Sequence, residues 1–147
     1  MDASVNLKLL GKNQEDLKII SAYLQDSILI IKDIAFLKQN RTFVMIVNRF
    51  MWEDVEKGVF RQNKRIRCAV KFEEVIKVES KNINQKNKNK PLECLAIKCI
   101  SIFDEIYKIK IFFAGDSIIT IISEVIHVTL HDLGKPWNVK YIPIHKI

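Results

Sequence analysis

The chain has 147 residues, of which 48% are hydrophobic and 28% are charged, with only four glycines and three prolines. This composition is typical of a folded protein and excludes a collagen-like or low-complexity chain. The length allows one sizeable hydrophobic core, so we expect residues 1–147 to form a single globular domain.

The beginning of the chain and its cysteines indicate the cytoplasm. The first 16 residues include Asp2 and contain no unbroken apolar run, so they do not resemble a secretory signal. The longest apolar runs, at 28–31 and 118–122, are too short to span a bilayer, and we expect no membrane span. Three cysteines without paired spacing favour reduced thiols in a cytosolic protein.

The positive charge is concentrated in one segment. The formal net charge is +7, and residues 57–90 contain 11 Lys and Arg against three Glu, a local balance of +8. The rest of the chain contains 13 basic and 14 acidic residues. The 24 Ile, 19 Lys and 10 Asn share AT-rich codons, so genome composition is an alternative source of the basicity.

Short strand patterns dominate the chain after a single helix. Residues 5–9 alternate as a strand, and the apolar spacing after Asn13 predicts a helix over 14–25 with Asn13 as its N-cap. Later strand patterns occupy one or two stretches within 27–38, then 42–50, 66–72 and, after a bend at Glu73-Glu74, 75–79. Further strand patterns follow at 92–102, 107–113 and 117–122.

The segment 124–133 fits either a strand or a short helix. Its β-branched residues favour a strand that ends in one helical turn, followed by an irregular tail that contains Pro136 and Pro143. Hairpin-length connections are typical of antiparallel pairing. We therefore predict an α+β, mainly β fold: an antiparallel sheet of about seven strands, curled or sandwich-like, with one N-terminal helix packed on it.

No pattern in the sequence identifies a catalytic or metal site. In a strand, His127 and His131 would lie about 13 Å apart, too far to bind one ion. Cys94 and Cys99 are five positions apart and are expected on opposite faces of one strand. The glycines occur singly, which excludes a phosphate-binding loop. We therefore expect no metal, no cofactor and no catalytic residues.

Two groups of residues remain as candidate sites. The first is an anion or nucleic-acid patch formed by basic side chains of two connections, and a solubilising surface is the alternative reading. Its candidate members are Arg61, Lys64, Arg65, Arg67, Lys86 and Lys88. The second is a structural or interaction corner in which Arg49 would pair with Glu53 or Asp26. Its candidate members are Asn48, Arg49, Trp52 and Glu53.

Short motifs in order along the chain resemble a known family. They include Asn48-Arg49-Phe50 with Trp52-Glu53, Phe113-Ala114-Gly115, and Asp132-Leu133-Gly134 with Pro136-Trp137. Together they resemble an uncharacterised alphaproteobacterial family of single-domain proteins, the domain of unknown function 2948. The resemblance implies a bacterial cytosolic protein and no established catalytic residues. It also implies an arginine-rich connection after Trp52-Glu53, which Arg61, Lys64 and Arg65 match.

The sequence favours a non-catalytic cytosolic binding or adaptor module whose partner is a protein or an anionic molecule. Two alternatives stay open. One is a nucleic-acid-binding domain that uses the basic segment 57–90, and the other is a small enzyme whose site has no recognisable motif. Loss of binding in a variant without the basic side chains would separate the nucleic-acid alternative from the other two.

Overall fold

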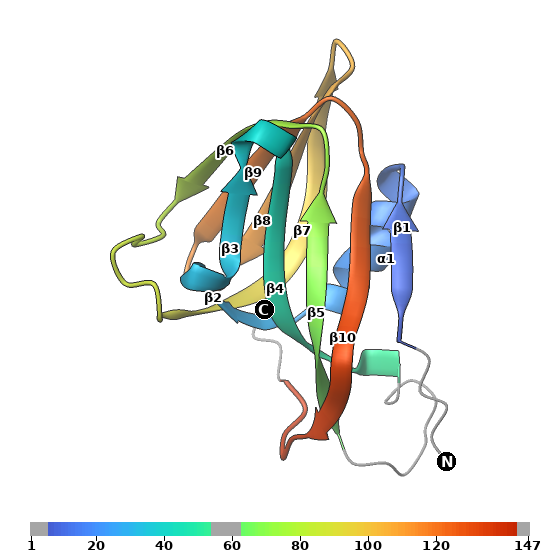
Figure 1. The fold of residues 1–147 in the computed structure, drawn as a ribbon, viewed down its shortest axis with the longest axis vertical. Coiled ribbons are helices and arrows are strands. Elements are labelled where there is room, and N and C mark those ends of the chain that lie inside the picture. Colours follow the sequence, from blue (N-terminus) through green and yellow to red (C-terminus); the bar gives the residue numbers. More distant parts are fainter. Residues whose placement is uncertain (1–5, 54–62, 144–147) are drawn as a thin grey trace.

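The computed structural model describes residues 6–53 and 63–143. The elements that lie wholly within these ranges are one α-helix, α1, two short 3-10 helices, η1 and η2, and ten strands, and Trp52 and Glu53 are also helical (Figure 1). In chain order they are β1 Lys8–Gly11, α1 Gln14–Leu24, β2 Ile28–Ile30, η1 Ile31–Asp33, β3 Ile34–Leu37, η2 Lys38–Asn40, β4 Thr42–Phe50, β5 Lys64–Phe72, β6 Val75–Lys81, β7 Pro91–Phe103, β8 Ile106–Phe113, β9 Ser117–Ser123 and β10 Val128–Asn138. No helix in the described ranges is both long and apolar enough to span a lipid bilayer.

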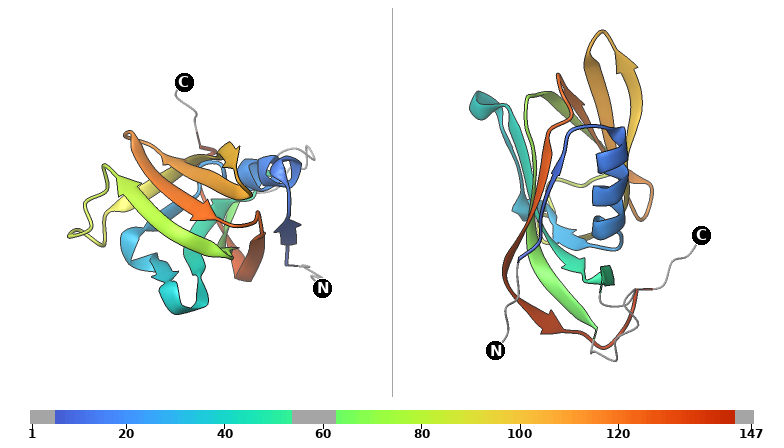
Figure 2. Two further views of the ribbon diagram at one scale, coloured as in Figure 1. Left: turned by 90° about the horizontal axis from the view of Figure 1, so that it is seen from above. Right: turned by 90° about the vertical axis from the view of Figure 1, so that its right-hand side faces the viewer.

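All ten strands belong to one antiparallel sheet. Its order is β1-β10-β5-β4-β2-β7-β8-β9-β6, and β3 pairs with β4 beside this path. The sheet curls so that β6 to β9 lie behind β3, β4, β5 and β10, and the view from above shows the strands surrounding a common interior (Figures 1 and 2). Short β2 connects the two halves, because it pairs with both β4 and β7.

The hydrophobic core fills the inside of this curled sheet. Alternation places one side of each strand inward, as in β5, where Ile66, Cys68, Val70 and Phe72 are buried. Phe43 of β4 contacts Phe72 across the strand pair, with ring centroids 6.0 Å apart. The strand residues that alternate with these buried side chains point outward. Each half of the sheet therefore also has an outer face that no other layer covers within the described residues.

Helix α1 closes the side of the curled sheet between β1 and β7 (Figure 2). Asn13 caps it as the spacing predicts, because its side chain accepts a hydrogen bond of 2.8 Å from the Asp16 backbone. The buried residues Leu17, Ile20 and Leu24 face the core. The predicted helix over 14–25 is therefore confirmed to within one residue.

A seam remains on the other side, between the free edges of β3 and β6. A groove of about 240 Å³ follows it, with Phe36 of β3 and Val78 of β6 among its lining residues. Backbone hydrogen bonds join the two sides at its ends, from Val75 to Arg41 and from Lys32 to the Lys88 carbonyl. The seam is thus a bounded slot and not a continuous opening.

The predicted count of about seven strands is wrong, because there are ten. The segment 27–38 contains two strands separated by η1. At Glu73-Glu74 the chain turns, with Glu74 at φ 57°, and changes partners: β5 pairs with β4 and β10, whereas β6 pairs with β9. Mainly antiparallel β structure with one helix is confirmed.

The C-terminal part is more regular than predicted. β10 continues through Pro136 to Asn138, and no helical turn follows Leu133. A register shift between Leu133 and Trp137 allows this, because Pro136 lies in the irregular stretch and needs no ladder hydrogen bond there. The predicted irregular tail at Pro136 is therefore wrong.

Candidate functional site

Arg49 lies at the centre of the predicted corner and is completely buried. Its guanidinium donates to both oxygens of Asp132, at 2.8 and 2.7 Å, and to both oxygens of Glu53, at 3.0 and 2.8 Å. The Tyr23 ring lies 5.6 Å from the guanidinium carbon. Burial opposes the charge on Arg49, but the hydrogen bonds to Asp132 and Glu53 outweigh burial and raise the pKa of the guanidinium.

This arginine cluster, Arg49 with Glu53 and Asp132, connects distant parts of the chain. Arg49 is on β4 and Asp132 is on β10, while β5 lies between the two strands. Asp132 also accepts a hydrogen bond of 3.3 Å from the Leu7 backbone. The pairing with Glu53 is one of the two pairings that the sequence predicts. Asp132 was not predicted, because sequence spacing gives no sign of a partner 83 residues away.

The other corner residues also stabilise the fold. Trp52 donates through Nε1 to the Gln25 carbonyl at 2.8 Å, and its ring packs against Phe50 at 4.6 Å. Arg65 donates at 3.0 Å to the carbonyls of Asn48 and Asp26, and it lies over the Phe50 ring. The predicted corner therefore consists of hydrogen bonds and ring contacts that hold the end of β4 beside the start of β5.

The predicted basic patch is spread over several environments. Arg61 lies outside the described residues. Lys64 and Arg65 are half-buried at the start of β5, and burial lowers the pKa of Arg65. Arg67 is exposed on the outer face of β5, 3.9 Å from Asp33. Lys86 and Lys88 are exposed in the β6–β7 connection.

A denser group of cations lies on the outer face of β6 to β9. Lys98 of β7 is directly opposite Lys110 of β8, and Lys108 lies on the same face of β8, two residues before Lys110. On β6, alternation places two further lysines on this face. We call this surface the lysine face; its members are Lys77, Lys81, Lys98, Lys108 and Lys110.

The lysine face carries far more positive than negative charge. Glu79 is the one acidic residue that the same alternation places among the five lysines, and it lies 3.4 Å from Lys77. Like charges directly opposite each other destabilise a sheet, so the Lys98–Lys110 pair has an energetic cost in the isolated protein. Sequence analysis missed this surface, because its lysines lie on three strands whose pairing the sequence does not reveal.

The thiols differ in accessibility. Cys68 and Cys94 are buried, and burial raises the pKa of each to about 12. Cys99 is half-exposed. The expectation that Cys94 and Cys99 point to opposite faces is wrong, because the register shift between Cys94 and Ala96 reverses the alternation. Both cysteines lie opposite buried residues of β8, Phe113 and Ile109.

His127 and His131, the two histidines in the described residues, do not form a metal pair. His127 precedes β10, and its Nε2 lies 3.1 Å from a Glu73 oxygen. His131 is on the outer face of β10, opposite Lys8 of β1. Within residues 6–53 and 63–143, no three histidine, cysteine or acidic side chains are grouped so that they could hold a metal ion.

Fold and surface together define a mainly β protein with a curled antiparallel sheet and a basic outer face. The chain belongs to the family described as "Protein of unknown function (DUF2948)", which it matches over residues 7–145. Comparison with curated proteins and with solved structures gave no match.

Proposed function

We propose that this protein is a non-catalytic binding module for nucleic acid, and that the lysine face holds the phosphate backbone. The observation that carries the proposal is the direct opposition of Lys98 and Lys110 beside Lys108. A polyanion bound here would relieve the repulsion between these lysines and would release its own counterions. Both effects favour binding.

The basic segment 57–90 contributes to this surface through its second half. Lys77 and Lys81 belong to the lysine face, and the connection that carries Lys86 and Lys88 leaves β6 directly after Lys81. In the first half of the segment, Arg65 donates hydrogen bonds to backbone carbonyl groups and is already used by the fold. We therefore assign the anion-binding role to the lysines of β6 to β8 and the following connection, and not to the start of β5.

The rest of the functional description is part of the same proposal. We propose that residues 1–147 are one domain of a bacterial protein that acts in the cytoplasm. The continuous path of hydrogen-bonded strands from β1 to β6 supports the single domain. The three free cysteines support a reducing compartment.

The test is binding of a labelled single-stranded oligonucleotide, measured by fluorescence anisotropy across salt concentration. Replacing Lys98, Lys108 and Lys110 with Gln should weaken binding and reduce the slope of log K against log salt by about 2, since each single-strand phosphate contact contributes about 0.7.

A matched control removes the same charge elsewhere. Lys38, Lys135 and Lys140 are exposed outside the lysine face, and their replacement with Gln should leave the salt slope unchanged. Equal losses in both triple variants would mean that only net charge matters. Absence of binding at low salt would overturn the proposal.

A second candidate, protein docking by an adaptor, is favoured by the free end of the β7–β8 hairpin. Ile102 and Phe103 are 52% and 75% exposed there, and Ile100 and Ile106 are exposed beside them. Clustered exposed apolar side chains often mark a contact surface. If the lysine face carries the function, replacing Ile102 and Phe103 with Ser should leave oligonucleotide affinity unchanged. If the end of the hairpin carries a docking function, the same replacement should abolish docking.

A further inference from the structure

We infer that the groove between α1 and β7 receives an unpaired base of a single-stranded nucleic acid whose phosphates lie on the lysine face. This inference rests on the proposed function and specifies the kind of nucleic acid that is bound. It follows from the position of the groove, the chemistry of its lining, and the residue that it shares with the lysine face.

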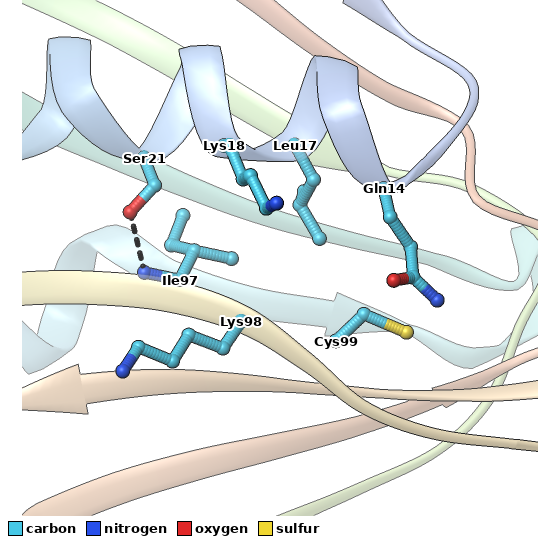
Figure 3. A pocket seen from close by; sticks show the side chains of 7 residues that line it. All are labelled: Gln14, Leu17, Lys18, Ser21, Ile97, Lys98 and Cys99. Carbon is cyan, nitrogen blue, oxygen red and sulfur yellow. Dashed lines mark hydrogen bonds between the residues drawn. The ribbon is translucent and has the colours of Figure 1, made fainter.

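The groove exists because β7 changes neighbours. β2 pairs with β7 only over Pro91–Glu93, and beyond that point α1 lies along the strand. Ser21 of α1 accepts a hydrogen bond of 2.9 Å from the Ile97 backbone, which fixes the helix beside the strand (Figure 3). The space left between them is about 300 Å³. Its lining residues are Gln14, Leu17, Lys18, Ser21, Ile97, Lys98 and Cys99.

The lining suits a flat apolar ring with polar edges and a nearby negative charge. Leu17 and Ile97 form the floor of the groove and are each only 2% exposed, so the apolar surface that a ring would contact comes mainly from the stems of the longer lining side chains. Strand alternation turns the Cys99 N–H in the same direction as the Ile97 N–H, away from β8 and toward α1. The lining contains two lysines and no carboxylate. Lys18 lies 3.4 Å from Glu15, but this exposed ion pair is weak and leaves the ammonium accessible.

Lys98 connects the groove with the lysine face. It lines the groove and also lies opposite Lys110 on β8. A strand whose phosphates contact Lys110 and Lys98 therefore reaches the groove at its next nucleotide. Bases of a duplex are paired and stacked, and extruding one costs a few kcal/mol, whereas a single strand offers its bases freely. The arrangement thus favours single strands over duplexes.

The accessible thiol in the groove provides a direct readout. Cys99 is half-exposed, while Cys68 and Cys94 are buried. Burial raises the pKa of all three thiols, to about 12 at Cys68 and Cys94, so an alkylating reagent modifies the native protein first at the accessible Cys99. The rate of Cys99 alkylation by iodoacetamide, followed by mass spectrometry, then reports whether the groove is occupied.

The experiment compares three oligonucleotides of equal length with the whole protein. They are a mixed-sequence single strand, an abasic strand with the same phosphates, and a duplex, each added at a concentration that anisotropy shows to be saturating. At saturation the mixed-sequence strand should slow the alkylation of Cys99 throughout the protein sample. The abasic strand and the duplex should bind through their phosphates and leave the alkylation rate unchanged.

A variant that fills the groove gives an independent test. Gln14 is exposed at the groove, and Gln14→Trp should weaken binding of the mixed-sequence strand about tenfold, the loss expected for one base contact. Affinity for the abasic strand should not change. Ala22→Trp, at an exposed position of α1 that is not part of the groove lining, is the matched control and should alter neither affinity.

The outcomes separate this inference from the proposed function. Binding of the single strand without protection of Cys99, or equal protection by the abasic strand, would overturn the base-binding groove and leave nucleic-acid binding in place. Protection by anionic lipid vesicles or an acidic peptide, with no oligonucleotide bound, would overturn both. Failure of every oligonucleotide to bind would overturn the proposed function and this inference with it.

Discussion

Arg49 shows how a single buried charge can organise a β protein. Four hydrogen bonds to two carboxylates hold its guanidinium. A buried ion pair contributes little net stability over apolar packing, but removing one partner leaves an uncompensated charge. The cluster therefore fixes the relative positions of β4, β10 and the segment at Glu53 more than it adds to the overall stability.

Arg49→Met should destabilise the protein by about 3–5 kcal/mol, because Asp132 would remain buried without its cation. The measurement is urea unfolding followed by circular dichroism. The double variant Arg49→Met with Asp132→Leu is the control and should recover part of the loss. A single variant that unfolds with nearly the native midpoint would show that the cluster has no such role.

At the scale of the elements, the lysine face places two like charges directly opposite each other. Lys98 and Lys110 repel each other across β7 and β8, and Phe112 provides only a ring 6.0 Å from the Lys98 ammonium. Exposed positions of a β-strand accept many residues, so charge repulsion is not required by the fold. The proposed binding surface for anions would account for a lysine at both positions.

Lys110→Thr should therefore stabilise the free protein by about 0.5 kcal/mol, because it removes a directly opposed like charge and introduces a β-branched residue. Lys108→Thr is the matched control, since Lys108 lies opposite Ser101 and Ile122 and its removal relieves no opposed pair. Thermal unfolding of the two variants is compared, and a larger stabilisation by Lys108→Thr would contradict the repulsion argument.

Local patterns predict the elements well and their assembly poorly. The spacing after Asn13 predicts α1, and the alternation from Ile66 to Phe72 predicts β5. The register shift in β7 could not be predicted, so Cys94 and Cys99 were expected on opposite faces although they lie on the same one. Asp132 and the lysine face were missed for a related reason: both depend on which strands are neighbours, and hydrophobic periodicity contains no information about pairing.

At the scale of the whole molecule, β10 holds the first half of the sheet together. It lies between β1 and β5, with Leu130 opposite Leu9 on one side and Val70 on the other. β1 has only four residues and pairs with β10 alone. Loss of β10 would therefore leave two strands without their common neighbour, whereas loss of β1 would remove only a short edge.

A chain shortened to residues 1–125 should show no cooperative thermal transition by circular dichroism, because the inner faces of β5 and β1 would be uncovered together. A chain that starts at residue 12 and lacks β1 should still unfold cooperatively, at a lower temperature than the full chain. If the chain without β10 unfolded as cooperatively as the full chain, the central role of β10 would be refuted.

The seam between β3 and β6 has a consequence for behaviour at high concentration. Unpaired strand edges are sites at which sheets of different molecules join into aggregates. Here two free edges face each other across a slot whose ends are tied by Val75–Arg41 and Lys32–Lys88, so an incoming strand meets the opposite wall before it can align. The edge at β1 is short and carries Lys8. The edges of β3 and β6 thereby offer almost no length along which a second molecule could extend the sheet.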